Sequence, residues 1–143
     1  MKIENVLATK GSSVHTIGPE ESIREALRQL AEHNVGALVV TGNDGLPTGI
    51  LSERDITRSL ATSLDVVDQQ VRDLMTRKIV TGSPSDDVDA VLQTMTNAHF
   101  RHLPVVQDGH LVGIVTTGDL VKARLADMQG TVETLETQLL NSN

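Results

Sequence analysis

Cysteine, tryptophan and tyrosine are absent from this chain of 143 residues, and phenylalanine occurs once. Without cysteine there is no disulfide framework, no thiolate nucleophile and no cysteine-based metal site. With almost no aromatic side chains, there is little on which nucleic-acid bases could stack. The charge also argues against nucleic acid, because 19 acidic residues against 12 Lys and Arg give a net charge of −7 and nucleic-acid surfaces are normally basic.

Long apolar runs are missing as well. No stretch approaches the roughly 20 apolar residues that span a bilayer, and the first residues lack the apolar segment of a signal peptide. We therefore expect a soluble cytoplasmic protein with no membrane partner. A chain of this length buries about two-thirds of its unfolded surface, which supports one compact core.

Common catalytic and metal-binding motifs are also lacking. The five histidines form no His-Glu-x-x-His motif and no i, i+4 pair, so we expect no metal site. There is no Gly-x-Ser-x-Gly elbow and no Gly-rich loop that ends in Gly-Lys-Ser/Thr. Nothing supplies a nucleophile with a paired general acid and base, and we expect no enzyme activity and no required cofactor.

What is present is a repeat. Residues 49–56 read GILSERDI and residues 113–120 read GIVTTGDL, so that Asp55 and Asp119 hold equivalent positions. Two copies of so long a unit indicate a duplication rather than a solenoid, which needs at least three repeats. We predict a first unit over 1–63, a second over 64–126 and a helical tail over 127–143. Three further segment pairs line up: 5–8 with 73–76, 14–19 with 79–84, and 37–40 with 103–106.

Each copy predicts the order strand, helix, strand, strand, helix, an α/β (α+β) unit. The first helix has apolar residues spaced i, i+3, i+4, i+7, which marks one buried stripe. A Val-rich run and an Asp-Gly turn follow, and these favour a hairpin. The two apolar stripes are Ile23, Ala26, Leu27, Leu30 and Ala31, and Val88, Val91, Leu92 and Met95; the short first strands are expected at Val14–Ile17 and Ile79–Thr81.

The tail continues as a helix with a heptad pattern. Its apolar residues are spaced 4, 3, 4, 3, 4 and form an a/d seam. We expect Gly130 to interrupt this helix, because glycine costs about 1 kcal/mol relative to alanine. The seam fits either a coiled coil with a partner or packing on the protein's own dimer, and we favour the second. The seam residues are Val121, Leu125, Met128, Val132, Leu135 and Leu139.

The repeat resembles the cystathionine-β-synthase (CBS) domain in its tandem pair, and most closely the small bacterial proteins that contain little else. The resemblance is carried by residues 49–55, 101–106 and 113–119 and covers roughly residues 3–126. It implies two motifs packed about a pseudo-two-fold axis, with a C-terminal helix here added. It also implies clefts that bind adenosine-containing ligands, a flat homodimer, and a sensor that does no chemistry.

The Ser52-x-x-Asp55 and Thr116-x-x-Asp119 patterns have two interpretations. The first is a helix capping box, in which hydroxyl and carboxylate satisfy free amides at a helix start. The second is a ligand site, because the same helix start offers amide donors to a phosphate and the carboxylate can accept from ribose hydroxyls. The two are compatible. The resemblance gives Asp55 and Asp119 the ribose role and gives Ser52 and Thr116 ribose or phosphate contacts.

The resemblance further implies that each site is shared between the copies. For most of the apolar residues involved, a core role is the simpler interpretation, whereas the hydroxyls of Thr16 and Thr81 could meet the edge of the base. We expect Asp119 to act with Val14, Thr16, Val35, Gly36 and Ile114, and Asp55 with Ile50, Ile79, Thr81, Phe100 and Arg101.

Phosphate contacts are predicted for cationic residues near these positions. Arg101, followed by His102, stands where the first copy has Gly36, and the planar donors of arginine suit phosphate. Arg54 precedes Asp55, whereas the second copy has Gly118 there, so we expect unequal sites. Lys10 is a weaker candidate.

The function we expect is a regulatory, energy-sensing module that binds AMP, ADP or ATP. Such a homodimer would signal to a separate effector protein. The alternatives are binding of S-adenosylmethionine or NADH, and a ligand-free structural or dimerisation module.

Overall fold

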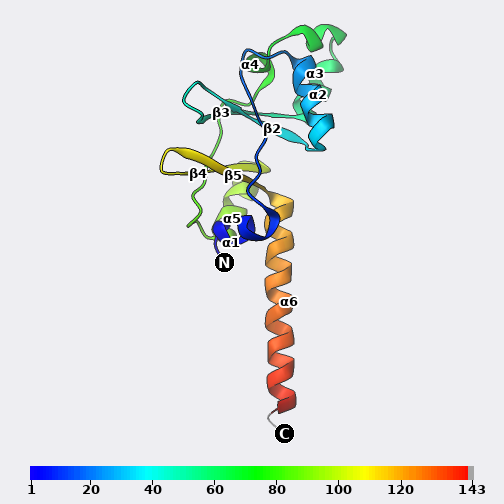
Figure 1. Cartoon of the computed structure of the whole chain (residues 1–143). Helices are drawn as coiled ribbons and strands as arrows, with labels where there is room; N and C mark the ends of the chain where they lie inside the picture. The colour runs from blue at the N-terminus through cyan, green and yellow to red at the C-terminus, as the bar shows by residue number, and fades with distance from the viewer. Residues whose placement is uncertain (142–143) are drawn as a thin grey trace.

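The computed structural model describes residues 1–141 and shows two similar units followed by a long helix (Figure 1). The first unit contains a parallel β1–β2 pair and a β2–β3 hairpin, and the second a β4–β5 hairpin. The elements are α1 (Ile3–Lys10), β1 (Thr16–Ile17), α2 (Ile23–His33), β2 (Ala37–Thr41), β3 (Pro47–Ser52), α3 (Glu53–Leu60), a 3₁₀ helix (Leu64–Asp68), α4 (Val71–Leu74), α5 (Val88–Ala98), β4 (His102–Gln107), β5 (His110–Thr116) and α6 (Thr117–Asn141).

The predicted order of elements is found in both units, with one strand missing. β1 is shorter than expected, and the strand expected at Ile79–Thr81 does not form. Its place is taken by a single parallel bridge between Gly82 and Val105. That prediction was wrong because one bridge leaves the segment as irregular chain beside β4.

The two short helices α1 and α4 are exchanged between the units. Ile3 and Glu4 donate backbone hydrogen bonds to the carbonyls of Asp86 and Pro84 in the second unit. In the same way, the amides of Val71 and Arg72, at the start of α4, donate to the carbonyls of Glu21 and Pro19 in the first unit. The exchange is therefore reciprocal, as a pseudo-two-fold relation between the units requires.

The hydrophobic clusters follow this exchange. Ile3, Val6 and Leu7 of α1 lie in one cluster with the buried residues of α5, β4 and β5. Val71 of α4 lies in the other, with the buried residues of α2, β2 and β3. Within α2 the predicted stripe is buried at Ile23, Ala26 and Leu30 and half-buried at Leu27, whereas Ala31 faces solvent.

Gly49 and Gly113, the glycines that open the repeated phrase, lie under the exchanged segments. A Cβ at Gly49 would stand 2.7 Å from Met75 Sδ and 2.9 Å from the Thr76 carbonyl oxygen, and one at Gly113 would stand 2.9 Å from Leu7 Cδ2. Each glycine is thus needed for a close approach of two segments.

Helix α6 leaves the second unit and projects away from it as a single rod (Figure 1). Gly130 does not interrupt it, contrary to expectation, and the helix runs unbroken through that residue. In the single chain the seam is uncovered, since Leu125, Met128 and Val132 face solvent. Among the helices of residues 1–141, none is both long and apolar enough to cross a bilayer.

Candidate functional site

Both predicted capping boxes are present. The Ser52 amide donates to Asp55 Oδ2 at 3.1 Å and the Asp55 amide donates to Ser52 Oγ at 3.2 Å. At the second position, the Thr116 amide donates to Asp119 Oδ2 at 2.8 Å and the Asp119 amide donates to Thr116 Oγ1 at 3.1 Å. The repeated motif therefore caps α3 and α6 in the same way, at the points where the chain leaves β3 and β5.

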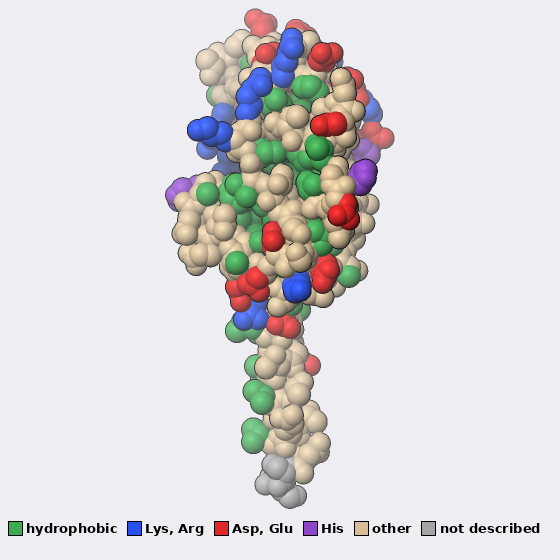
Figure 2. All heavy atoms as spheres, turned by 90° about the vertical axis from the view of Figure 1, so that its left-hand side faces the viewer, with side chains coloured by type: hydrophobic (Ala, Val, Ile, Leu, Met, Phe, Trp, Pro, Cys, Tyr) green, Lys and Arg blue, Asp and Glu red, His purple; other side chains and the backbone are tan. Residues whose placement is uncertain are grey.

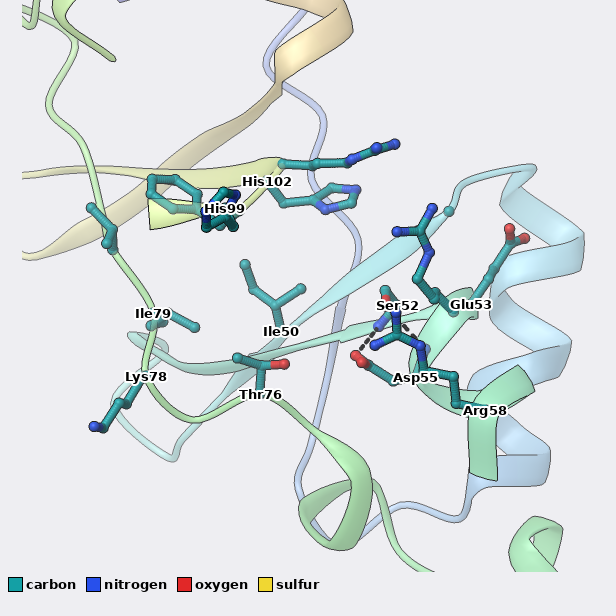
Figure 3. Close-up of a pocket in the computed structure, with 15 residues that line it drawn as sticks. Ile50, Ser52, Glu53, Asp55, Arg58, Thr76, Lys78, Ile79, His99 and His102 are labelled. Atoms are coloured by element: carbon teal, nitrogen blue, oxygen red, sulfur yellow. Dashed lines mark hydrogen bonds between the residues drawn. The ribbon is translucent and has the colours of Figure 1, made fainter. Parts of the chain in front are cut away.

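A cavity of about 470 Å³ lies beside Asp55, between the two units (Figure 3). This Asp55 cavity has a volume typical of small-molecule sites. In Figure 3, Ser52, Glu53 and Asp55 come from the start of α3, and Ile79 of the second unit lies across the cavity from them, while the end of the neighbouring Lys78 points away. It is lined by Gly36, Ile50, Ser52, Glu53, Arg54, Asp55, Arg58, Thr76, Lys78, Ile79, Val80, His99, Phe100, Arg101 and His102.

The wall of the Asp55 cavity is cationic in an acidic protein. Four cationic side chains line it against two acidic ones, although the chain as a whole carries a net charge of −7. The cations are Arg54, Arg58, Lys78 and Arg101. Within residues 1–141 none of the four forms an ion pair with Asp55, whose Oδ2 is held by its own cap. The cavity therefore presents several cationic donors, one carboxylate oxygen free for a ligand, and a helix start.

Most of the residues predicted around Asp55 do line the cavity: Ile50, Ile79, Phe100, Arg101, His102, Ser52 and Arg54. Thr81 does not. It lies in an adjoining cavity of about 210 Å³, which Val80 and Phe100 share with the first. Gly36 was predicted with Asp119 but lines the Asp55 cavity, because its carbonyl accepts the Glu53 amide at the start of α3. Arg101 matches it in the second unit, where its carbonyl accepts the Thr117 amide.

The sequence prediction missed Arg58, Lys78, Thr76, His99, Val80 and Glu53. For two of these residues, the sequence contained a pattern that could have predicted them. Arg58 lies four residues after Arg54, and residues with that spacing share a helix face. Lys78 matches Lys10 in the repeat and could have been inferred from it. The position of Thr76 depends on its reciprocal backbone bonds with Ile50, at 3.0 and 2.9 Å, which no side-chain pattern indicates.

The Asp119 position is arranged differently. Lys10 Nζ lies 2.6 Å from Asp119 Oδ2 and also donates to the Ile114 carbonyl at 2.8 Å. Burial pushes the pKa of Asp119 upward, but the hydrogen bonds from Lys10 and Thr116 outweigh it and leave the pKa below its ordinary value. The chain's own ammonium therefore holds this carboxylate.

The other residues predicted with Asp119 are more dispersed. Val35 packs against the core of the first unit. Thr16 is exposed on β1, where it pairs with Val39, and Val14 precedes that strand. Gly118 lies exposed in the first turn of α6. Within residues 1–141 no hydrogen bond joins Val14, Thr16 or Val35 to Asp119.

His102 lies between the two acidic positions. Burial lowers the pKa of His102 below its ordinary value of 6.5. The carboxylates of Asp119 and Asp55 oppose this shift, and the cations of Arg101 and Lys10 add to it. The imidazole is therefore neutral at pH 7 and offers one donor and one acceptor to the cavity. Among residues 1–141, no three His, Asp or Glu side chains gather as a set of metal ligands.

Comparison with known proteins gives a consistent result. The CBS domain matches residues 6–62 and again residues 71–126. The CBS domain-containing protein YhcV of Bacillus subtilis is 34% identical over 127 residues, which cover 87% of this chain and 89% of that protein. The crystal structure of the CBS-domain containing protein ATU1752 from Agrobacterium tumefaciens superposes with a TM-score of 0.82 at 39% identity, covering 87% of this chain and 99% of that one.

A further solved structure was determined with bound molecules. The CBS domain pair of protein MJ0100, in complex with 5′-methylthioadenosine and S-adenosyl-L-methionine, has a TM-score of 0.78 at 27% identity and covers 89% of this chain and 98% of that one. The duplicated phrase, the exchanged helices and these matches agree, and the chain belongs to the CBS-domain family as a tandem pair.

Proposed function

We propose that this protein is a regulatory module that binds an adenosine nucleotide in the Asp55 cavity. The observation that carries the proposal is the cationic wall beside a capped helix start. Phosphates bind cationic donors, and Arg54, Arg58 and Lys78 supply them beside the positive end of α3. Opposite them, Ile50, Ile79 and Phe100 offer an apolar surface for the base.

Asp55 takes the ribose in this arrangement. Its Oδ2 accepts the Ser52 amide, and no hydrogen bond from residues 1–141 reaches Oδ1. A carboxylate oxygen at this place can accept from a ribose hydroxyl, as acidic residues do in dinucleotide-binding folds. The capping role and the ligand role then use different oxygens of one side chain.

The charge of the cavity favours phosphate-bearing ligands. S-adenosylmethionine carries a sulfonium cation next to its ribose, which four nearby cations would repel, whereas AMP, ADP and ATP carry anionic phosphates there. The protein MJ0100 binds adenosine-containing molecules without phosphate. For this chain we place ADP and ATP ahead of AMP, and S-adenosylmethionine behind; charge alone does not separate them from NADH, whose phosphates are also anionic.

The bound nucleotide would be signalled by a change in the conformation of the protein. Because both units line the cavity, a bound nucleotide contacts α3 of one and the 76–80 segment of the other. A ligand shifts a conformational equilibrium only by its differential affinity for the two states. We propose that the protein acts as a homodimer whose geometry responds to the nucleotide and is read by a separate effector, with no chemistry on the ligand.

The test is thermal unfolding and calorimetric titration with AMP, ADP, ATP, S-adenosylmethionine and NADH. A ligand at a hundred times its dissociation constant adds about 2.7 kcal/mol of stability. Asp55→Asn keeps an oxygen for the cap and should weaken nucleotide binding by about tenfold or more, while Asp119→Asn is the matched control with a smaller effect. An intact wild type that binds none of the five would instead support the ligand-free structural module.

A further inference from the structure

The seam of α6 is the largest feature that nucleotide binding does not use. The matched CBS domain ends at residue 126, so most of the projecting helix lies beyond it. Along this helix Leu125, Met128, Val132 and Leu135 are 61%, 52%, 52% and 54% exposed. Figure 2 shows these apolar side chains along one edge of the tail. Such a helix, apolar on one side and without tertiary contacts on it, is marginal in water unless a partner covers that side.

We propose that this seam is covered by the same seam of a second copy, with the two α6 helices antiparallel. The spacing assigns Leu125 and Val132 to heptad position a, and Val121, Met128 and Leu135 to position d. In an antiparallel pair, a residues meet d residues. One register sets Leu125 against Leu135 of the second copy, and the same register sets Met128 against Val132 of the second copy.

The charges beside the seam select this partner and this direction. In the same register Lys122 of one copy faces Glu136 of the other, and the two-fold symmetry gives this contact twice. In a parallel pair the flanking positions would instead set Lys122 against Thr117 and Glu136 against Thr131, without an opposite-charge contact. Neither Lys122 nor Glu136 forms an ion pair or hydrogen bond within residues 1–141. The seam is therefore complementary to itself in shape and in charge.

The position of Gly130 fits the same arrangement. It is the midpoint of the proposed register and lies on the outer face, where an added Cβ would meet nothing within 4 Å. The bodies of the two copies then lie at opposite ends of the helix pair. This association uses no residue of the Asp55 cavity and does not depend on the nucleotide.

The experiment measures mass against concentration by sedimentation equilibrium on the full chain. Leu135→Lys places a charge in the seam and should weaken the association step that the seam provides by about tenfold or more. Thr137→Lys puts the same charge on the outer face of the same helix and should leave this step unchanged. Equal masses for wild type and Leu135→Lys at every concentration would overturn the proposal.

Charge reversal tests whether the two α6 helices are antiparallel. Lys122→Glu and Glu136→Lys should each weaken the step several-fold, because each creates two like-charge contacts, and the double variant should restore it. If neither single variant has an effect, or the double variant does not recover, the antiparallel arrangement is wrong. A wild type that stays monomeric but captures another protein through the seam would likewise overturn the second copy as the occupant.

Discussion

At the scale of single residues, Lys10 and Lys78 separate the two halves of the repeat. They hold matching positions in sequence, yet Lys10 binds Asp119 and Lys78 lines the Asp55 cavity. The cause is local. α1 continues as helix up to Lys10, whereas α4 ends at Leu74 and the chain then bridges to Ile50 in extended form. The equivalent lysines therefore differ: Lys10 binds the carboxylate in one half, whereas Lys78 lies at the edge of the cavity and does not bind Asp55 in the other.

This difference predicts that the two sites bind nucleotide with unequal affinity. Substituting one of the lysines should make the two affinities more similar. Lys10→Met keeps the length of the side chain, removes its charge and frees Asp119, so a second nucleotide should bind more tightly than in the wild type. Lys78→Met removes a phosphate donor and should weaken the first site by roughly tenfold, since hydrogen bonds to charged groups contribute about 1.5–3 kcal/mol. Calorimetric titration of both variants tests this, and equal independent sites in the wild type would contradict it.

His102 predicts a pH dependence of stability. Its pKa is lowered in the folded state, so the unfolded chain takes up a proton first as the pH falls below 6.5. Stability should therefore decline from pH 6.5 downward until the folded pKa is passed, and Asp119 adds a further loss below its ordinary value of 3.8. Urea midpoints between pH 7.5 and 5 would show the first decline. His102→Gln should flatten it, and an unchanged slope in that variant would assign the effect elsewhere.

At the scale of elements, the sequence predicted those helices and strands whose apolar residues or turns follow a clear pattern. α2, α5 and both hairpins follow from apolar stripes and Asp-Gly turns. α1 was not predicted, because only Ile3, Val6 and Leu7 of its eight residues are buried and their burial comes from the other unit. The strand at Ile79–Thr81 was overpredicted, because β propensity cannot report that only one bridge is made.

Two glycines predict opposite effects of the same substitution. Gly49→Ala would press a methyl group onto the Thr76 carbonyl and Met75, and should destabilise the fold by about 1–3 kcal/mol while disturbing the Ile50–Thr76 wall of the Asp55 cavity. Gly130→Ala meets no neighbour within 4 Å and should strengthen α6 by about 0.5–1 kcal/mol. Circular dichroism during urea unfolding compares the two. A neutral Gly49→Ala would show that the exchanged segment can move away.

At the scale of the whole molecule, the candidate site is a product of the exchange of α1 and α4. Sequence could name Asp55, Arg54 and Arg101, because motif and charge mark them. It could not show that Lys10 would reach Asp119 or that Thr81 would lie outside the cavity, since both depend on how one unit sits on the other. The candidate site is therefore set by packing between the repeats more than by either repeat alone.

The exchange of α1 and α4 also predicts which elements lose stability when a residue of one short helix is mutated. Ile3 is fully buried in the core of the second unit, and Val71 is fully buried in the core of the first. Ile3→Ala should cost about 2–5 kcal/mol, and Val71→Ala somewhat less. Because α1 is covalently part of the first unit but packs in the second, Ile3→Ala should speed amide exchange first in α5, β4 and β5, and Val71→Ala in α2, β2 and β3. Native-state hydrogen exchange resolves the two patterns.

Faster amide exchange only in the unit that carries each mutation in sequence would mean that α1 and α4 do not pack on the opposite units in solution. The Asp55 cavity, which the second unit lines as well, would then need a different explanation.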